Sequence, residues 1–179
     1  PELEKLVLHW MAEMDGTIRT AIDAHDYNTM IQKLHHFCSV DLSAFYFDIR
    51  KDRLYCDRPD GFERRACRTV LYHLFECLVT WFAPILSFTA EEAWGYRPAS
   101  MQPNVNSVHL TTYPAIPAEW KNDELSAKWD KIRDVRRVVL GALEPKRADK
   151  TIGSSLEAHP KIFVKVDVAE ILTGVDMAE

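Results

Sequence analysis

The hydrophobic positions near the N-terminus recur at steps of three and four residues. They are Leu3, Leu6, Val7, Trp10, Met11, Met14, Ile18 and Ile22. A single apolar face with this period predicts an amphipathic helix of roughly twenty residues. Asp26 stands where an N-cap would begin a second helix, and a second apolar stripe runs from Tyr27 towards Leu54.

The segment Asp57–Gly61 is dense in turn-forming residues and predicts a break in the chain. A third and strongly apolar helix is predicted after it, with a stripe from Ala66 to Phe82, and Pro84 ends or kinks it. The apolar stripes of these three helices indicate a shared core. Its expected members are Trp10, Leu34, Phe45, Leu74, Leu78 and Trp81.

Thr89 and Glu92 have the spacing of a capping box, so we expect Thr89 to be the N-cap of a short helix that runs through Trp94. Four prolines between residues 95 and 117 predict a long irregular connection. The last helical stripe is expected to stop near Pro145. It consists of Leu125, Trp129, Ile132, Val135, Val139 and Leu143.

Alternating apolar residues between Ile162 and Val168 predict a short strand. The whole pattern therefore favours a mainly α fold, an antiparallel helix bundle with a small α/β C-terminal appendage. We expect the bundle to cover residues 1–147 and the appendage to be the start of a small, truncated mixed α/β subdomain at 148–179.

Composition narrows the class of protein. A chain of 179 residues suits one domain, or one domain with an appendage. No apolar run reaches the roughly 20 residues of a membrane span, and no signal peptide is recognisable, so we expect a soluble, cytoplasmic protein without a membrane partner. No cysteine pair has the spacing of zinc ligands, so reduced, mostly buried thiols are expected. The four cysteines are Cys38, Cys56, Cys67 and Cys77.

The net charge of −5 argues against a general nucleic-acid binder, but the charge is unevenly distributed. Residues 50–68 hold seven basic and four acidic side chains, a local charge of +3. Residues 128–150 hold eight basic and four acidic side chains, a local charge of +4. Such patches can bind phosphates although the chain as a whole is acidic, whereas a solvated charged face is the simpler alternative.

Two groups of cations are candidates for RNA contacts. Three end the second helix and three begin the third, and a short turn between antiparallel helices brings both sets to one end of the bundle. They are Arg50, Lys51, Arg53, Arg64, Arg65 and Arg68. We expect Lys51, Arg64 and Arg68 to contact the RNA backbone, with Arg53 and Arg65 as the first candidates for structural roles. The second group, on the last helix, is Arg133, Arg136 and Arg137.

Catalytic and metal-binding motifs are missing from the sequence. There is no phosphate-binding GxxxxGK[ST], no GxGxxG, no GxSxG and no HExxH. Glu91 and Glu92 are neighbours on the expected short helix, so their carboxylates diverge and a capping role explains Glu92 more simply. No catalytic residue, metal site or bound cofactor is therefore expected in this chain.

Four sequence strings occur in an order and at a spacing that resemble a known family. They are DLSAFYFDIRKDRLYCD (Asp41 to Asp57), RRACRTVLYHL (Arg64 to Leu74), APILSFTAEEAW (Ala83 to Trp94) and IGSSLEA (Ile152 to Ala158). Together they resemble the C-terminal anticodon-binding helical bundle of bacterial isoleucyl-tRNA synthetases, which are class I enzymes. The resemblance runs from about Leu3 to Ala158. Valyl and leucyl enzymes share the bundle, and one of their modules remains an alternative, as does a helical protein-interaction domain.

The resemblance implies a part of an ATP-dependent ligase that joins isoleucine to tRNA(Ile) and edits misacylated valine in a separate domain. ATP and magnesium, and in many members zinc, belong to other parts of such an enzyme. The expected partners of this chain are tRNA(Ile) and the remaining synthetase domains in cis, in a monomeric protein. Pro145 departs from the family pattern, in which the helix usually continues.

We predict that the chain alone does not activate isoleucine, because neither the HIGH nor the KMSKS signature of the nucleotide site occurs in it. The measurement is isoleucine-dependent exchange of pyrophosphate into ATP, with purified chain free of host synthetase. Exchange above the background of a mock purification would contradict this prediction.

Overall fold

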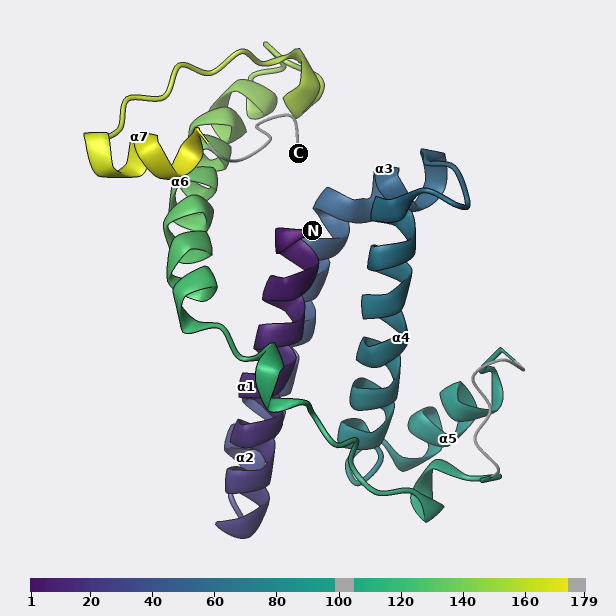
Figure 1. The fold of residues 1–179 in the computed structure, drawn as a ribbon. Coiled ribbons are helices and arrows are strands. Elements are labelled where there is room, and N and C mark those ends of the chain that lie inside the picture. The colour runs from purple at the N-terminus through teal and green to yellow at the C-terminus, as the bar shows by residue number, and fades with distance from the viewer. Residues whose placement is uncertain (99–104, 174–179) are drawn as a thin grey trace. The chain divides into compact units, whose positions relative to one another are not determined.

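The computed structural model of the protein describes residues 1–98 and 105–173. The chain divides into two compact units, Pro1–Asn122 and Asp123–Glu179, and each is described by itself. Helices dominate both, which confirms the mainly α class (Figure 1). Across the described ranges, no helix combines the length and the apolar character that crossing a bilayer requires.

The first unit begins with the two helices that the apolar stripes predict. α1 spans Glu2–Asp23 and α2 spans Tyr27–His36. Asp26 caps α2 as predicted, because its carboxylate accepts hydrogen bonds from the backbone N–H of Thr29 at 3.1 Å and from the Thr29 hydroxyl at 2.6 Å. This cap satisfies a backbone donor that the first helical turn leaves open.

The second predicted helix continues without a break from Tyr27 to Cys56, but it is not α-helical throughout. Between α2 and α3 (Asp48–Cys56) lies η1 (Phe37–Phe47), which is a π-helix. π-helical turns close with i→i+5 bonds and are rare beyond a single turn. Phe37 and Leu42 are five residues apart and both are buried, which the wider turn allows. A period of 3.6 residues does not predict this change.

The turn predicted at residues 57–61 leads into α4 (Phe62–Phe82), which ends just before Pro84 as expected. α4 packs against α1 and α3, and its buried face includes Val70, Leu74 and Trp81. Figure 1 shows α3 beside the first turns of α4.

The core of this unit contains five of the six expected residues. Trp10, Leu34, Phe45, Leu74 and Trp81 are all buried, and the Trp10 and Phe45 rings lie 5.9 Å apart between centroids. Leu78 is the exception. It is only half-buried because it lies at the margin of the α4 stripe that Val70, Leu74 and Trp81 define.

α5 (Ser87–Gly95) begins earlier than the predicted capping box requires, so the assignment of Thr89 as its N-cap is wrong. The N-cap position is Leu86, and no side chain caps the helix. The reason lies in the tight turn after α4, where the Phe82 carbonyl accepts from the backbone N–H groups of Ile85 at 2.9 Å and Leu86 at 2.7 Å. The chain enters α5 directly from this turn, and Thr89 already lies inside the helix.

The connection after α5 is irregular where it is described, as the prolines predict, apart from η3 (Val108–Leu110) and η4 (Ala118–Trp120). It is fixed to the helices by specific contacts. The backbone N–H of Asn122 donates to Nδ1 of the buried His9 at 2.8 Å, and the Trp120 ring meets His73 edge-on at 5.0 Å. A segment without regular structure is thereby held against α1 and α4.

The second unit contains α6 (Asp123–Ala148), η5 (Ser155–Glu157) and α7 (Val166–Leu172). The expected stop near Pro145 is wrong, because Pro145 lies inside α6. Proline removes one N–H that would bond to the carbonyl of Gly141. Both residues are exposed, so water can solvate that carbonyl, and the helical bonds resume as Asp149 donates to the Pro145 carbonyl at 3.0 Å.

The strand predicted at residues 162–168 is also wrong. Residues 161–165 are irregular, and α7 begins at Val166 with Ala169 donating to the Lys165 carbonyl at 2.9 Å. A strand needs a partner to pair its backbone groups, and the described ranges of the chain contain no second strand. The described part of the appendage is therefore helical or irregular. Its boundary at 147/148 stays a prediction.

Phe45→Ala tests the core. Phe45 is 4 % exposed, and its removal should lower the free energy of unfolding by about 3–5 kcal/mol through lost burial and the resulting cavity. Chemical denaturation monitored by circular dichroism measures the change. Phe88→Ala is the matched control, because Phe88 is 92 % exposed and its loss should change stability by no more than about 0.5 kcal/mol. Equal effects of the two substitutions would contradict the assignment of Phe45 to the core.

Candidate nucleic-acid interface

The predicted cations at the end of α3 and the start of α4 lie at the same end of the first unit, on either side of the short turn (Figure 1). Their side chains, however, have different surroundings. Acidic groups interleave with most of them and offset the repulsion that six neighbouring cations would otherwise cause.

Arg50 does not belong to the surface. Its side chain is 3 % exposed, and the guanidinium donates two hydrogen bonds to the Glu4 carboxylate. Nε donates to Oε1 at 2.7 Å and Nη2 donates to Oε2 at 3.0 Å. Glu4 is itself 5 % exposed, so the pair is shielded from solvent. Arg50 therefore has a structural role, and the expectation that it contacts RNA is corrected.

Three other candidates are engaged near the α3–α4 turn. The exposed Lys51 lies 3.1 Å from the Asp48 carboxylate. Arg53 lies 3.8 Å from the Asp57 carboxylate, while Arg64 donates through Nη1 to the backbone carbonyl of Asp57. Asp57 thus connects the last turn of α3 to the first turn of α4. Arg64 is half-buried, which makes it a residue that fixes the turn.

Arg65 and Arg68 differ from the other seven candidates. Both are exposed on α4, and in the described part of the chain neither guanidinium has an ion-pair or hydrogen-bond partner. We expected a structural role for Arg65, but its exposed guanidinium without a protein partner favours a role in binding instead. Single-sequence reasoning could not separate Arg65 from Arg64, since adjacent helical positions differ only in the direction in which they point.

Arg65 and Arg68 line a groove between α4 and α5 with a volume of about 820 Å³. Its described walls combine cationic, aromatic and small side chains, and none of these lining residues is acidic. The lining residues are Arg65, Arg68, Thr69, Leu71, Tyr72, Phe75, Ala93, Tyr96, Arg97 and Pro98. This groove brings predicted RNA-binding arginines and aromatic rings into the lining of one cavity.

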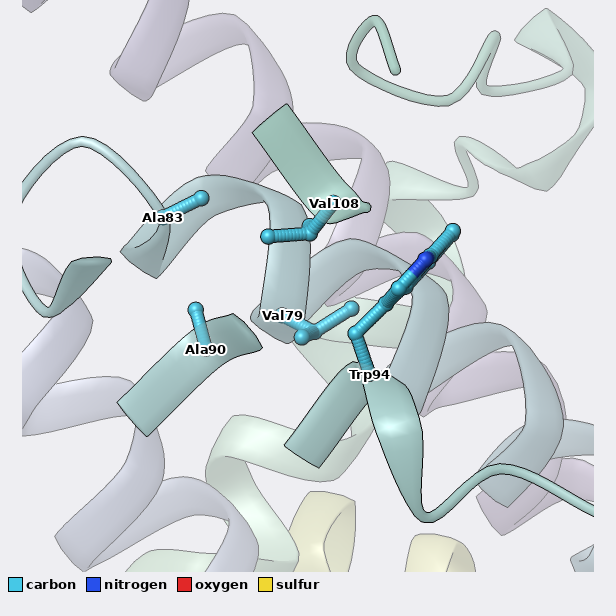
Figure 2. Close-up of a cluster of buried hydrophobic side chains, with 5 residues drawn as sticks. All are labelled: Val79, Ala83, Ala90, Trp94 and Val108. Carbon is cyan, nitrogen blue, oxygen red and sulfur yellow. The ribbon is translucent and has the colours of Figure 1, made fainter. Parts of the chain in front are cut away.

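A cluster of buried side chains holds α5 against α4 beneath this groove. Figure 2 shows its five members, Val79 and Ala83 at the end of α4, Ala90 and Trp94 on α5, and Val108 from the following connection. The groove residues Phe75 and Ala93 pack against this cluster. Glu91 completes the arrangement, because its carboxylate accepts from the Ser107 hydroxyl at 2.9 Å and from the Val108 N–H at 3.0 Å.

Arg97 is a groove residue that the sequence analysis missed. Its guanidinium carbon lies 3.3 Å from the Trp94 ring centroid, and its Nε donates to the Trp94 carbonyl at 2.7 Å. Burial lowers the pKa of Arg97, but arginine remains protonated at neutral pH. No helical periodicity predicts this contact, because α5 ends at Gly95 and Arg97 folds back onto Trp94 from the irregular segment that follows.

The expectation of mostly buried thiols holds for half of the cysteines, because Cys67 and Cys77 are buried, whereas Cys38 is half-buried and Cys56 is exposed. The Tyr46 hydroxyl donates to the Cys67 sulfur at 3.3 Å, and burial raises the pKa of Cys77 to about 12. Burial also raises the pKa of Cys38 and of Cys67. Because the thiolate is the metal ligand and the nucleophile, these protonated thiols are suited to packing.

The second predicted group lies on α6 in the other unit. Arg137 is exposed and donates to Asp134 at 2.9 Å, while Arg133 and Arg136 are half-exposed and engaged with other groups. An acidic partner is thus established for Arg137, and the role of the three arginines in RNA binding stays a prediction.

Comparison with known proteins identifies the family of this chain. Residues 4–162 match the model of the anticodon-binding domain of tRNA ligases. The chain belongs to this family. The match covers the first unit, including the α4–α5 groove, and much of the second.

Curated relatives extend the similarity over the whole chain. The isoleucine–tRNA ligase of Agrobacterium fabrum is 56% identical over 180 aligned residues, and those of Mesorhizobium japonicum and Bartonella henselae are 53% and 49% identical. Each alignment covers 100% of this chain and 18% of the relative. The chain thus spans about a fifth of the length of the relatives that it matches.

Arg50→Met tests the structural role of the buried ion pair. The substitution leaves the Glu4 carboxylate buried without a countercharge, which should lower the free energy of unfolding by about 3–5 kcal/mol. Lys51→Met, at the adjacent exposed pair, should cost no more than about 1 kcal/mol. In a double-mutant cycle with Glu4→Leu, the combined variant should be less destabilised than the sum of the two single variants. Equal stability of the Arg50 and Lys51 variants would contradict the assignment.

Proposed function

We propose that this chain binds the anticodon stem and loop of a tRNA and contributes that contact to an isoleucine–tRNA ligase. The family match over residues 4–162 carries the proposal, because it assigns nearly the whole chain to anticodon-binding domains. The names of the relatives, at 48–56% identity, favour isoleucine tRNA over the valine and leucine tRNAs that related modules would bind.

Arg65 and Arg68 are the proposed backbone contacts. A guanidinium without a protein partner can donate two parallel hydrogen bonds to a phosphate without first breaking an ion pair. They are one helical turn apart on α4, and the walls of their groove carry no acidic side chain that would repel RNA. Lys51 and Arg53 are at the same end of the unit and would contribute long-range attraction, while Arg64 holds the turn.

In the whole protein, the remaining steps belong to parts outside this chain. We propose that those parts bind ATP and magnesium, join isoleucine to tRNA, edit misacylated valine and hold zinc where a zinc module is present. We also propose that the ligase works in the cytoplasm as a monomer. The present chain supplies rigid helices that place its cations and aromatic side chains against the tRNA.

Arg65→Gln and Arg68→Gln test the proposed contact in the whole ligase. Each substitution should weaken the binding of isoleucine tRNA and of a non-cognate tRNA about equally, because phosphate contacts carry no sequence information. The slope of log affinity against log salt concentration should fall by about 0.7–0.9 for each lost contact. Fluorescence anisotropy at several salt concentrations measures both quantities.

Lys33→Gln is the matched control, because Lys33 is an exposed cation on α2, away from the groove. If the double variant keeps the affinity and salt slope of the parent while Arg137→Gln changes them, the RNA lies on the α6 face. If the ligase binds tRNA no better than it binds an unrelated polyanion, a protein-interaction role becomes the better explanation.

A further inference from the structure

We infer that the groove between α4 and α5 is a subsite for a single unstacked nucleotide, with Arg65 and Arg68 on its phosphate and Tyr96 and Arg97 against its base. This inference rests on the proposed function. It names the cavity on the charged face in which one nucleotide of the RNA binds. The volume of about 820 Å³ lies within the range of pockets that enclose small ligands.

The charge of the groove fits a phosphate. Three arginines line it, and the two carboxylates that act electrostatically on Arg97 already accept hydrogen bonds from other donors. Glu76 accepts from the Tyr72 hydroxyl at 2.9 Å, and Glu91 accepts from Ser107 and Val108. A phosphate that enters the groove therefore meets cations without displacing an internal ion pair from Arg65 or Arg68.

The flat side chains fit a base. Arg97 approaches the Trp94 ring so closely, at 3.3 Å, that the guanidinium plane must lie on the indole, which leaves its other face to the groove. Its Nη1 is buried and has no hydrogen-bond partner among the described residues. A base can stack on the open face of this plane, while an acceptor for Nη1 must lie in the plane of the guanidinium, as a ribose or phosphate oxygen of the same nucleotide at its edge would.

Tyr72 from α4 and Tyr96 from the residue just after α5 complete the aromatic lining. The hydrogen bond to Glu76 orients Tyr72 and raises the pKa of its phenol, so the ring stays neutral. Tyr96 is 82 % exposed just after α5, where a large aromatic side chain gains nothing from core packing. An exposed ring beside arginines is the arrangement that binds unpaired bases by stacking.

The groove is rigid enough to select a ligand. The buried cluster in Figure 2 fixes the spacing of α4 and α5, and the Trp94 indole N–H donates to the Val105 carbonyl at 3.3 Å. The platform under Arg97 is therefore fixed before RNA binds, which lowers the entropic cost of association. Paired RNA keeps its bases stacked inside the helix, so the ligand must come from an unpaired loop.

The experiment compares two RNA probes in the whole ligase, an anticodon-arm hairpin with its unpaired loop and a fully paired duplex with the same number of phosphates. Tyr96→Ala should weaken hairpin binding by about five- to a hundredfold and leave duplex binding unchanged, because one stacked base is lost. Arg97→Lys keeps the charge but removes the plane, and it should have the same selective effect in the same direction. Phe88→Ala is the matched control, since Phe88 is exposed on α5 and does not line the groove.

Arg68→Gln separates this inference from the proposed function, since it should weaken both probes. If Arg68→Gln weakens binding and Tyr96→Ala has no effect, or weakens both probes equally, the groove holds backbone only and the inference is wrong. If the parent ligase does not bind the hairpin, both the inference and the proposed function fail. Photocrosslinking of a hairpin that carries 4-thiouridine in its loop should label Tyr96 or Tyr72, and labelling confined to α6 would overturn the inference.

Discussion

The buried ion pair between Glu4 and Arg50 is the constraint on which the rest of the first unit depends. It joins the first turn of α1 to α3 across 46 residues of sequence, and both groups are shielded from water. Such a pair adds little net stability, because desolvation consumes most of the Coulomb gain, but it tolerates only one alignment of the two helices. That alignment places the end of α3, the turn at Asp57 and therefore the start of α4. The face that carries Arg65 and Arg68 is positioned by this chain of contacts.

The basic side chains at the α3–α4 end of the first unit differ in the partners that they have. Glu4 neutralises Arg50 inside the core, Asp57 engages Arg53 and Arg64 at the turn, and Asp48 screens Lys51 at the surface. The two guanidiniums without a protein partner in the described residues, Arg65 and Arg68, line the cavity that also holds aromatic side chains. The paired cations add little repulsion to the helical unit. The positive charge that has no acidic partner lies at the groove, where an anion can bind.

The sequence predicted what depends on local periodicity. The stripes of α1, α2 and α4, the Asp26 cap and the turn at residues 57–61 are set by neighbours along the chain, and all are confirmed. The failures have causes that the hydrophobic period does not contain. Pro145 is tolerated because Gly141, whose carbonyl loses its helical donor, is exposed to solvent. Residues 162–165 stay irregular because the described ranges offer no strand that could pair with them. Thr89 follows a turn that has already begun α5. The same limit applies to the site, since the adjacent Arg64 and Arg65 look alike in sequence and only their burial and partners separate them.

The π-helical segment η1 has a consequence for how this family can vary in length. A wider turn stores extra chain inside a continuous helix, so losing one residue between Phe37 and Phe47 need not break it but would let a turn revert to α geometry. Because the wider turn had absorbed the extra residue, every residue beyond that point would keep its direction, and Arg50 would still face Glu4. The same deletion within an α-helical segment would instead rotate all following residues by about 100°. η1 is therefore the segment in which this helix can lose a residue while the basic residues that follow keep their direction.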